Sequence, residues 1–254
     1  MKKTRRILTA ACLLAAFSLQ AQTLQKQAAP DTASKPRLTV SGSVELASGY
    51  IWRGDRVCGA QFTPTLTLGY GRVSLQGFGY LALDGSYKEI DWDLSCRLGD
   101  FSLHVADYFF REASSPVAED YFNWKKGETN HVLEGIVCYE PERLPFAAKW
   151  FTFFYGDWLP QPDGSKGKAS FSSYLELEAY HRFGQAGRLS LFMGSSVLKG
   201  AYTNYTRDFA VIHLELRYAH TLTLGKLQMP LGFGYIVNPY RHTSYLNASV
   251  GVCF

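Results

Sequence analysis

From residue 37 onward, apolar and polar side chains alternate with a period of two over most of the chain. In residues 90–98, isoleucine, tryptophan, leucine and cysteine occupy the even positions, whereas aspartate, serine and arginine occupy the odd positions. Such alternation is typical of a β-strand whose two faces meet different environments. Three segments, 72–83, 129–140 and 145–158, carry apolar residues on both faces. In all, the pattern predicts twelve strands, over residues 38–53, 60–70, 72–83, 88–99, 101–110, 129–140, 145–158, 170–183, 188–199, 208–221, 229–237 and 243–254.

Two kinds of connection alternate between these predicted strands. One kind is short and mostly glycine-containing, at 69–71, 98–100, 140–144, 184–187 and 224–226. The other kind is longer, at 54–60, 84–88, 111–128, 159–169, 200–207 and 238–242. Short turns at one end, longer loops at the other and an even number of strands are typical of outer-membrane barrels. We therefore predict an all-β fold for residues 37–254: a transmembrane antiparallel up-and-down β-barrel of twelve strands.

Alternation alone does not say which face of each strand is buried, because a soluble lipocalin-like barrel places its apolar face inside. Twelve strands enclose more space than side chains fill, since about eight strands make a filled barrel. The polar face carries paired acids, at 91/93 and 176/178, that suit a wet or charge-paired interior. Most segments also reach the ~9–11 residues that cross a hydrocarbon layer at a tilt. We expect lipid on the apolar face and a lumen on the polar face; a secreted soluble β-protein is the alternative.

The first 36 residues have the character of an export signal followed by a leader. Residues 2–6 are basic, and residues 7–17 form an apolar run that is too short to span a bilayer as a helix. The small residue Ala21 predicts a cleaved signal peptide of residues 1–21. The polar, aperiodic residues 22–36 predict a flexible periplasmic leader. With an even strand number, this start predicts a bacterial outer-membrane location with both chain ends in the periplasm.

Composition and charge narrow the function classes. The mean hydropathy of −0.11 argues against a helical membrane bundle, and 15% aromatic residues with 23 glycines favour strands and turns. The formal charge of +4 is carried by residues 1–21, so the rest of the chain is neutral and a nucleic-acid partner is not expected. No cofactor or metal site is predicted. The cysteines after the signal peptide are far apart, which leaves disulfide pairing open: Cys58, Cys96, Cys138 and Cys253.

The chain ends on Phe254, in phase with the apolar face of residues 246–252. This resembles the C-terminal signature of bacterial outer-membrane proteins, a final aromatic on an amphipathic strand. The resemblance implies that Phe254 is an assembly signal and that the barrel-assembly machinery is a partner.

A second resemblance concerns residues 47–54, which read Ala-Ser-Gly-Tyr-Ile-Trp-Arg-Gly and are followed by Pro64 and Gly69-Tyr70. The stretch resembles the opening of the bacterial family Gcw_chp, whose first strand ends in Ser-x-Tyr-x-aromatic-Arg-Gly. The resemblance implies an outer-membrane barrel without naming an activity. By phase, Tyr50 and Trp52 are predicted at the lipid interface and Arg53 at the lumen mouth. Arg53 there either helps to select a solute or joins an internal ion pair.

The predicted lumen face is rich in charge. Its lining candidates are Glu45, Arg53, Asp91, Asp93, Arg97, Glu134, Lys149, Glu176, Glu178, Arg182, Glu215 and Arg217. The acids outnumber the bases by seven to five. This predicts a narrow, slightly cation-preferring, porin-like channel for small polar or ionic solutes, surrounded by outer-membrane lipid. The alternative is a structural or surface-binding barrel that is closed by its own salt bridges.

An enzyme is the contrasting class. His242 and Ser244 have the i,i+2 spacing that places both side chains on one strand face, the arrangement of an outer-membrane lipid hydrolase or deacylase. The sequence offers no third group to orient the histidine, so we predict that the protein is not an enzyme. The longest loop, 111–128, is rich in charged and aromatic residues. It is expected either to constrict the mouth or to stand outside as an exposed or binding surface.

Overall fold

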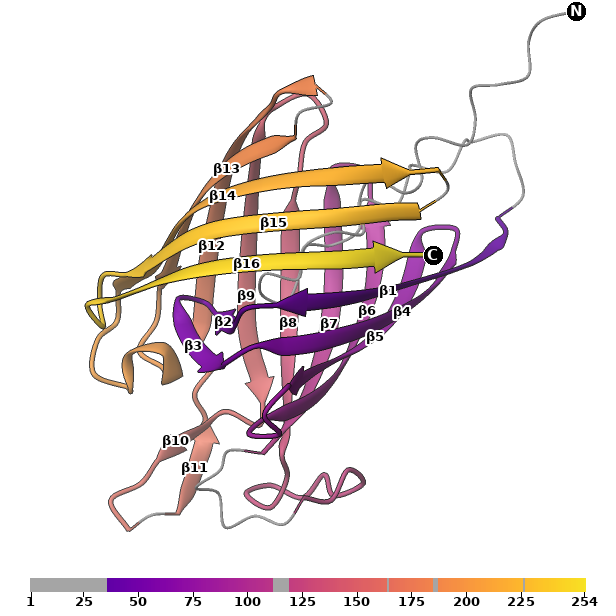
Figure 1. The fold of residues 1–254 in the computed structure, drawn as a ribbon. Helices are drawn as coiled ribbons and strands as arrows, with labels where there is room; N and C mark the ends of the chain where they lie inside the picture. The colour runs from indigo at the N-terminus through magenta and orange to yellow at the C-terminus, as the bar shows by residue number, and fades with distance from the viewer. Residues whose placement is uncertain (1–35, 112–118, 164, 185–186, 226) are drawn as a thin grey trace, which may run out of the picture.

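The computed structural model describes residues 36–111, 119–163, 165–184, 187–225 and 227–254. Within these ranges the chain forms a closed antiparallel up-and-down barrel of twelve strands, which confirms the predicted fold class (Figure 1). The wall consists of β1 (Leu38–Ala47), β4 (Gln61–Tyr70), β5 (Val73–Ala82), β6 (Lys88–Leu98), β7 (Phe101–Phe110), β8 (His131–Tyr139), β9 (Phe146–Tyr155), β12 (Ser173–Arg182), β13 (Arg188–Ser196), β14 (Ala210–Leu224), β15 (Leu227–Asn238) and β16 (Thr243–Cys253). The predicted signal peptide and all but the last residue of the predicted leader lie outside the described residues.

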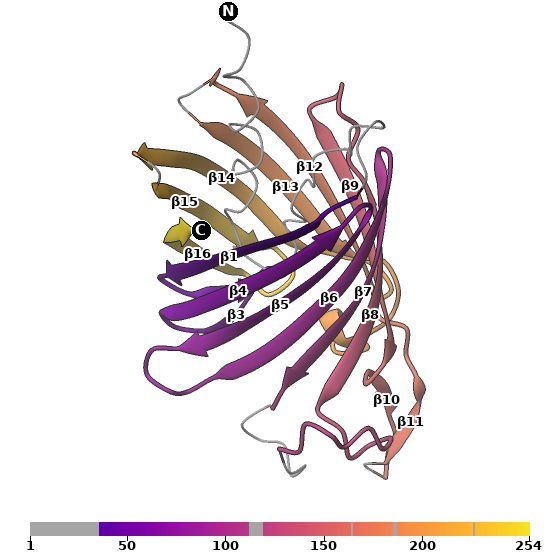
Figure 2. The ribbon, with the colours of Figure 1, turned by 90° about the vertical axis from the view of Figure 1, so that its right-hand side faces the viewer.

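Three short elements lie outside the barrel wall. A hairpin is formed by β2 (Tyr50–Trp52) and β3 (Asp55–Cys58), and a second by β10 (Trp158–Pro160) and β11 (Lys166–Ala169). A 3₁₀ turn, η2, spans Ala201–Thr203. The views in Figures 1 and 2 place β10–β11 beyond the end of the wall, on the side of the longer loops. No helix in the described part of the chain is long and apolar enough to cross a membrane.

The outward side of the wall is apolar and exposed. Leu66, Leu94 and Leu216 are each at least half exposed, whereas Asp91 and Glu215, which point inward, are 0% and 2% exposed. Side chains of the same kind recur on strands around the barrel, including Leu191 and Phe233. A soluble protein rarely exposes a continuous apolar surface of this extent, but a hydrocarbon layer stabilises it. The apolar face therefore looks outward, as the sequence predicts, and the wall is suited to span a bilayer.

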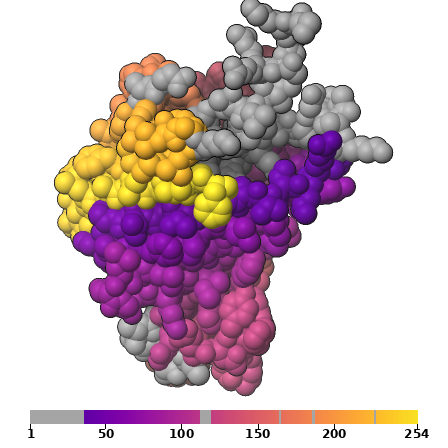
Figure 3. Space-filling view, turned by 45° about the vertical axis from the view of Figure 1, so that its right-hand side comes forward, coloured from indigo at the N-terminus to yellow at the C-terminus, as the bar shows by residue number. Residues whose placement is uncertain are grey.

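The first and last wall strands close the barrel along a seam. Residues 43–47 of β1 pair with residues 249–253 of β16. Beyond them, the Gly42 N–H donates to the Phe254 carbonyl and the Phe254 N–H donates to the Gly42 carbonyl, both at 2.9 Å. The Phe254 ring occupies the space that a Cβ on Gly42 would need. Figure 3 shows this seam as indigo atoms lying directly against yellow ones.

The region after β1 differs from the prediction. The sequence predicts one strand over residues 38–53, whereas β1 ends at Ala47 and a new hairpin begins at Tyr50. Asn247 holds this break, because the Ser48 hydroxyl donates to Asn247 Oδ1 at 2.7 Å and Asn247 Nδ2 donates to the Gly49 carbonyl at 3.0 Å. The prediction that Tyr50 and Trp52 lie at the lipid interface is wrong. Tyr50 stacks on the inward-facing Tyr80, and Trp52 packs against the buried interior cluster.

A bulge shifts the alternation in β14. Gly194 pairs with His213, but the next residue, Ser195, pairs with Val211, so Ile212 is an extra residue in β14. A bulge changes the phase of the side chains by one position. Ile212 is only 2% exposed and belongs to the interior cluster, although simple alternation places it on the lipid face with Leu214.

Candidate functional site

The β2–β3 hairpin enters the lumen through a tight turn at Arg53 and Gly54. Both residues have positive φ, 48° and 84°, as in the two-residue turns that match strand twist. A Cβ at Gly54 would overlap the carbonyl oxygen of Ile212 in β14, so glycine is the residue that permits this close approach. The tip of the hairpin therefore lies against β14, which is three strands from β1 around the barrel.

Arg53 is held there by a buried, bidentate ion pair. Its Nη1 and Nη2 donate to the two carboxylate oxygens of Glu134 in β8, each at 2.7 Å, and Nη1 also donates to the Tyr202 hydroxyl. Glu134 is 0% exposed and Arg53 is 5% exposed. β8 stands five strands from β1 around the barrel, so this contact spans the lumen. Because both charges are buried, each depends on the other for compensation.

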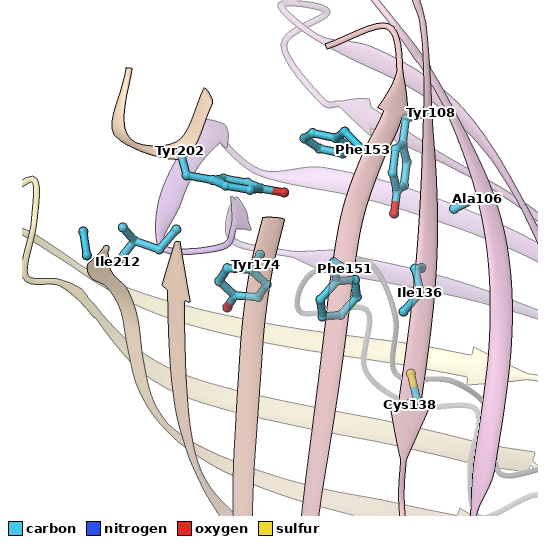
Figure 4. Packing of buried hydrophobic residues seen from close by; sticks show 10 residues of the cluster. Ala106, Tyr108, Ile136, Cys138, Phe151, Phe153, Tyr174, Tyr202 and Ile212 are labelled. Carbon is cyan, nitrogen blue, oxygen red and sulfur yellow. The ribbon is translucent and has the colours of Figure 1, made fainter. Parts of the chain in front are cut away.

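Aromatic rings surround the Arg53 guanidinium. Its Cζ lies 4.4 Å from the ring centre of Phe151 and 4.8 Å from that of Tyr174, within cation–π range. Tyr202 comes from η2, which folds into the lumen from the loop before β14. The cluster accounts for the apolar inward residues of β8 and β9, and Figure 4 shows most of its members: Ala106, Tyr108, Ile136, Cys138, Phe151, Phe153, Tyr174, Tyr202, Ala210 and Ile212. We call the β2–β3 hairpin and η2 the plug.

The plug is also tied to the mouth of the barrel. Asp55, which follows the hairpin turn, accepts a hydrogen bond from Asn238 Nδ2 at 3.0 Å. It also pairs with Arg241 Nε at 2.8 Å. The side chains of Arg241 and Asp55 are 34% and 37% exposed, so this second pair is solvated, unlike the pair of Arg53 with Glu134. The plug thus has one buried and one exposed ionic anchor.

Beyond the plug, the inward faces of β9 and β12 to β14 carry further ion pairs. Lys149 lies 3.7 Å from Glu176 and 3.8 Å from Glu140. Arg217 binds Glu215 through Nε at 2.7 Å and Nη2 at 2.6 Å. The remaining contacts join Arg188 to Glu178 and His213 to Glu215 and Tyr174. We call this set the ion-pair ladder.

The inward face of β6 is acidic. Glu89 accepts a hydrogen bond from the Tyr87 hydroxyl at 2.8 Å. Asp91 and Glu89 interact on this face, and both side chains are buried, at 0% and 5% exposed. An acidic side of this kind favours cations over anions near it.

All twelve predicted lining residues lie on the inward phase of the wall or in the plug. Nine are buried: Glu45, Arg53, Asp91, Asp93, Glu134, Lys149, Glu178, Glu215 and Arg217. Arg97 and Glu176 are half-buried, and Arg182 is exposed at the end of β12. The structure brings together Arg53 with Glu134, Lys149 with Glu176, and Glu215 with Arg217. The sequence reasoning missed Glu89, His104, Arg188 and His213, which share the inward phase, and it had no signal for Tyr202.

The described part of the longest loop covers the outside of the wall. His131 Nδ1 lies 2.9 Å from Asp107 Oδ1, its Nε2 lies 2.6 Å from the Tyr121 carbonyl, and its ring stacks on Trp124. Asp107 and His131 are on the outward phase of β7 and β8, because their cross-strand partners Leu133 and Phe109 share that face. Residues 119–128 therefore lie outside the lumen; residues 112–118 are not among those described.

Three further features, the His242 and Ser244 pair, the cysteines and the metal-ligating side chains, show less organised geometry than the plug and the ion-pair ladder. His242, with φ of 55°, and Ser244 are both exposed, and the described residues show no hydrogen bond between them. Among the cysteines of the described ranges, Cys58, Cys96 and Cys138 are free thiols. Within the same ranges no group of three or more histidine, cysteine or acidic side chains is arranged to hold a metal ion.

Comparison with known proteins gives likenesses of shape at low identity. No protein-family model matches the sequence, and no match is found among curated proteins. Among solved structures, the chain is similar to an outer-membrane channel from Pseudomonas putida F1, with a TM-score of 0.42 and 10% identity over 88% of this chain and 97% of that one. It is also similar to the NanC porin, with a TM-score of 0.42 and 10% identity over 85% of this chain and 99% of that one. A third similar structure is Salmonella typhi OmpF in complex with daunomycin, with a TM-score of 0.37 and 12% identity over 86% of this chain and 97% of that one. At these scores the likenesses carry no conclusion about what this chain does.

Proposed function

We propose that the protein is a bacterial outer-membrane barrel with both chain ends in the periplasm, and that it is a porin-like channel for small polar or ionic solutes that is closed at rest. The observation that carries this proposal is the plug, which lies across the lumen and is locked by Arg53 and Glu134. The apolar outer wall supports the membrane location. Membership of the Gcw_chp family remains a prediction from residues 47–70.

Burial supports closure at the level of the plug. Inward side chains from strands all around the barrel have almost no exposed surface there: Gln61 1%, Tyr80 0%, Glu134 0%, Tyr174 0%, His213 1% and Asn238 0%. A water-filled passage at this level would leave such side chains exposed. The resting lumen is therefore shut near the mouth that carries the longer loops.

The ion-pair ladder supports passage once the plug moves. Charged side chains line the wall beyond the plug, and Glu140, Glu176 and Arg188 keep 17–26% of their side-chain surface exposed. The plug is formed by loop segments, not by wall strands, so it can leave the lumen without breaking the barrel. The acidic inward face of β6 supports a preference for cations in the open state.

A second candidate, a closed structural or surface-binding barrel, is favoured by the aromatic cluster. Rings from β9 and β12 pack around the plug as in a permanent core. If the protein is such a closed barrel, the plug stays in the lumen permanently.

Planar-bilayer recording separates the two candidates. We expect the intact protein to be silent and a variant with residues 50–58 replaced by a short glycine-serine linker to conduct, with a reversal potential that favours cations. If neither protein conducts, although heat-dependent electrophoretic mobility shows that both are folded, the result supports the closed structural or surface-binding barrel. Steady conductance of the intact protein would contradict closure by the plug.

A further inference from the structure

Three inward side chains near the tight-turn end of β6 and β7 form a connected series. His104 Nδ1 lies 2.8 Å from Asp93 Oδ1, and His104 Nε2 lies 3.0 Å from Ser102 Oγ. Ser102 and His104 are two residues apart on β7, which places both on the lumen face. Asp93 lies on the neighbouring strand β6, in phase with them. The order is that of a nucleophile, a base and a group that orients the base.

The donor pattern fixes which ring nitrogen can act as the base. A carboxylate only accepts hydrogen bonds, so His104 Nδ1 carries the proton and donates to Asp93. In the neutral ring this leaves the Nε2 lone pair free to accept from the Ser102 hydroxyl. The second oxygen of Asp93 is buried and has no partner among the described residues, so the His104 ring is the contact that satisfies this carboxylate.

The surroundings suit a reaction at Ser102. His104 and Asp93 are 4% and 6% exposed, while Ser102 is half-buried on the lumen face of β7. Arg97 is the direct cross-strand neighbour of Ser102. Its guanidinium makes no hydrogen bond or ion pair with another side chain in the described part of the chain, so it is available to a ligand. A cation beside a nucleophile can stabilise the negative charge that develops on a carbonyl oxygen.

We propose that Ser102, His104 and Asp93 form a hydrolytic site that cleaves carboxylic esters of small polar molecules. Ser102 Oγ attacks the ester carbonyl carbon and its proton passes to His104 Nε2. The carbon–oxygen bond to the alcohol then breaks, and the alcohol leaves with that proton. Water attacks the acyl-serine, gives a proton to His104 and releases the acid, and the proton returns to Ser102. Ser102 and His104 are the catalytic residues; Asp93 is a positioning residue.

Ester hydrolysis is an activity distinct from solute passage, and the position of Ser102 determines from which end of the barrel a substrate enters. Ser102 is the second residue of β7, directly after the tight turn from β6, so it lies at the end of the barrel away from the plug. A substrate therefore reaches it from the tight-turn side while the plug is in place. The polar lumen and Arg97 favour a small ester that carries a negative charge.

Covalent labelling tests the proposal. The purified, folded full-length protein is treated with a fluorophosphonate, which reacts with activated serines, and the adduct is mapped by mass spectrometry. We expect the adduct on Ser102, no adduct in Ser102→Ala, and labelling at least ~100-fold slower in His104→Gln. Ser190→Ala, which removes a lumen serine on β13, is the matched control and should label at the normal rate.

Asp93→Asn separates a positioning role from a merely structural one. The amide can donate to His104 Nδ1 and so favour the wrong tautomer, which lowers the labelling rate at neutral pH by about 10²–10⁴-fold. The remaining reaction should then rise with hydroxide concentration, whereas a structural defect would lower the rate equally at every pH. Absence of a Ser102 adduct in the folded wild-type protein, or equal labelling of wild type and His104→Gln, would overturn the proposal.

Discussion

Substituting Glu134 by glutamine removes the charge that compensates Arg53 while keeping the shape of the side chain. Breaking a buried ion pair by removing one partner costs about 3–5 kcal/mol. The rings of Phe151 and Tyr174, 4.4 and 4.8 Å from Arg53 Cζ, contact the guanidinium in both proteins and therefore do not change this difference. About 3 kcal/mol or more therefore acts against the docked plug, which shifts the balance between docked and released plug on the order of 100-fold.

Planar-bilayer recording measures this shift as open probability. We expect openings in Glu134→Gln that the wild-type protein lacks. Arg241→Ala is the matched control, because it breaks the exposed pair with Asp55, and such pairs contribute only about 0–1 kcal/mol. Arg53→Met combined with Glu134→Leu should close the lumen again, since apolar replacement of a buried pair is often neutral. A folded but silent Glu134→Gln protein would refute the reasoning.

Three further predictions follow from the fold. Gly54→Ala should open the lumen much as Glu134→Gln does, because its Cβ would overlap the Ile212 carbonyl and its φ of +84° disfavours alanine; unchanged bilayer silence would count against the turn geometry. Leu94→Arg, on the outward face of β6, should lower the free energy of unfolding in lipid by ~2–4 kcal/mol; denaturant titration in vesicles would show no change if that face met water. Deleting Phe254 should reduce the heat-resistant folded fraction in the outer membrane, and a normal yield would remove its role in assembly.

Most of the wall strands could be predicted from the sequence, because the alternation of polar and apolar residues within one strand determines which side chains face inward. In β6 the polar Asp91 and Asp93 alternate with apolar residues, and the structure places the first kind inward and the second kind outward. The same phase would also have found Glu89 and His104. Their roles depend on pairing between strands, which a single-strand pattern does not contain.

The plug escaped prediction because its contacts are long-range. Tyr50 and Trp52 continue the alternation of β1, so the pattern alone predicts that they belong to the same strand. The break between them and Ala47 is stabilised by Asn247, which lies some 200 positions later in the chain. Ile212 was likewise misplaced because a bulge in β14 shows only when the strand is paired with its neighbour.

Cysteine accessibility on intact cells tests the central claim, that the β2–β3 hairpin lies inside the barrel, most directly. Ile51 is 2% exposed and takes no part in either ionic anchor, whereas Phe122 in the outer loop is 85% exposed. In a background with the native cysteines replaced by serine, we expect a bulky, membrane-impermeant maleimide to label Phe122→Cys rapidly and Ile51→Cys hardly at all. Equally rapid labelling of both positions would contradict the account.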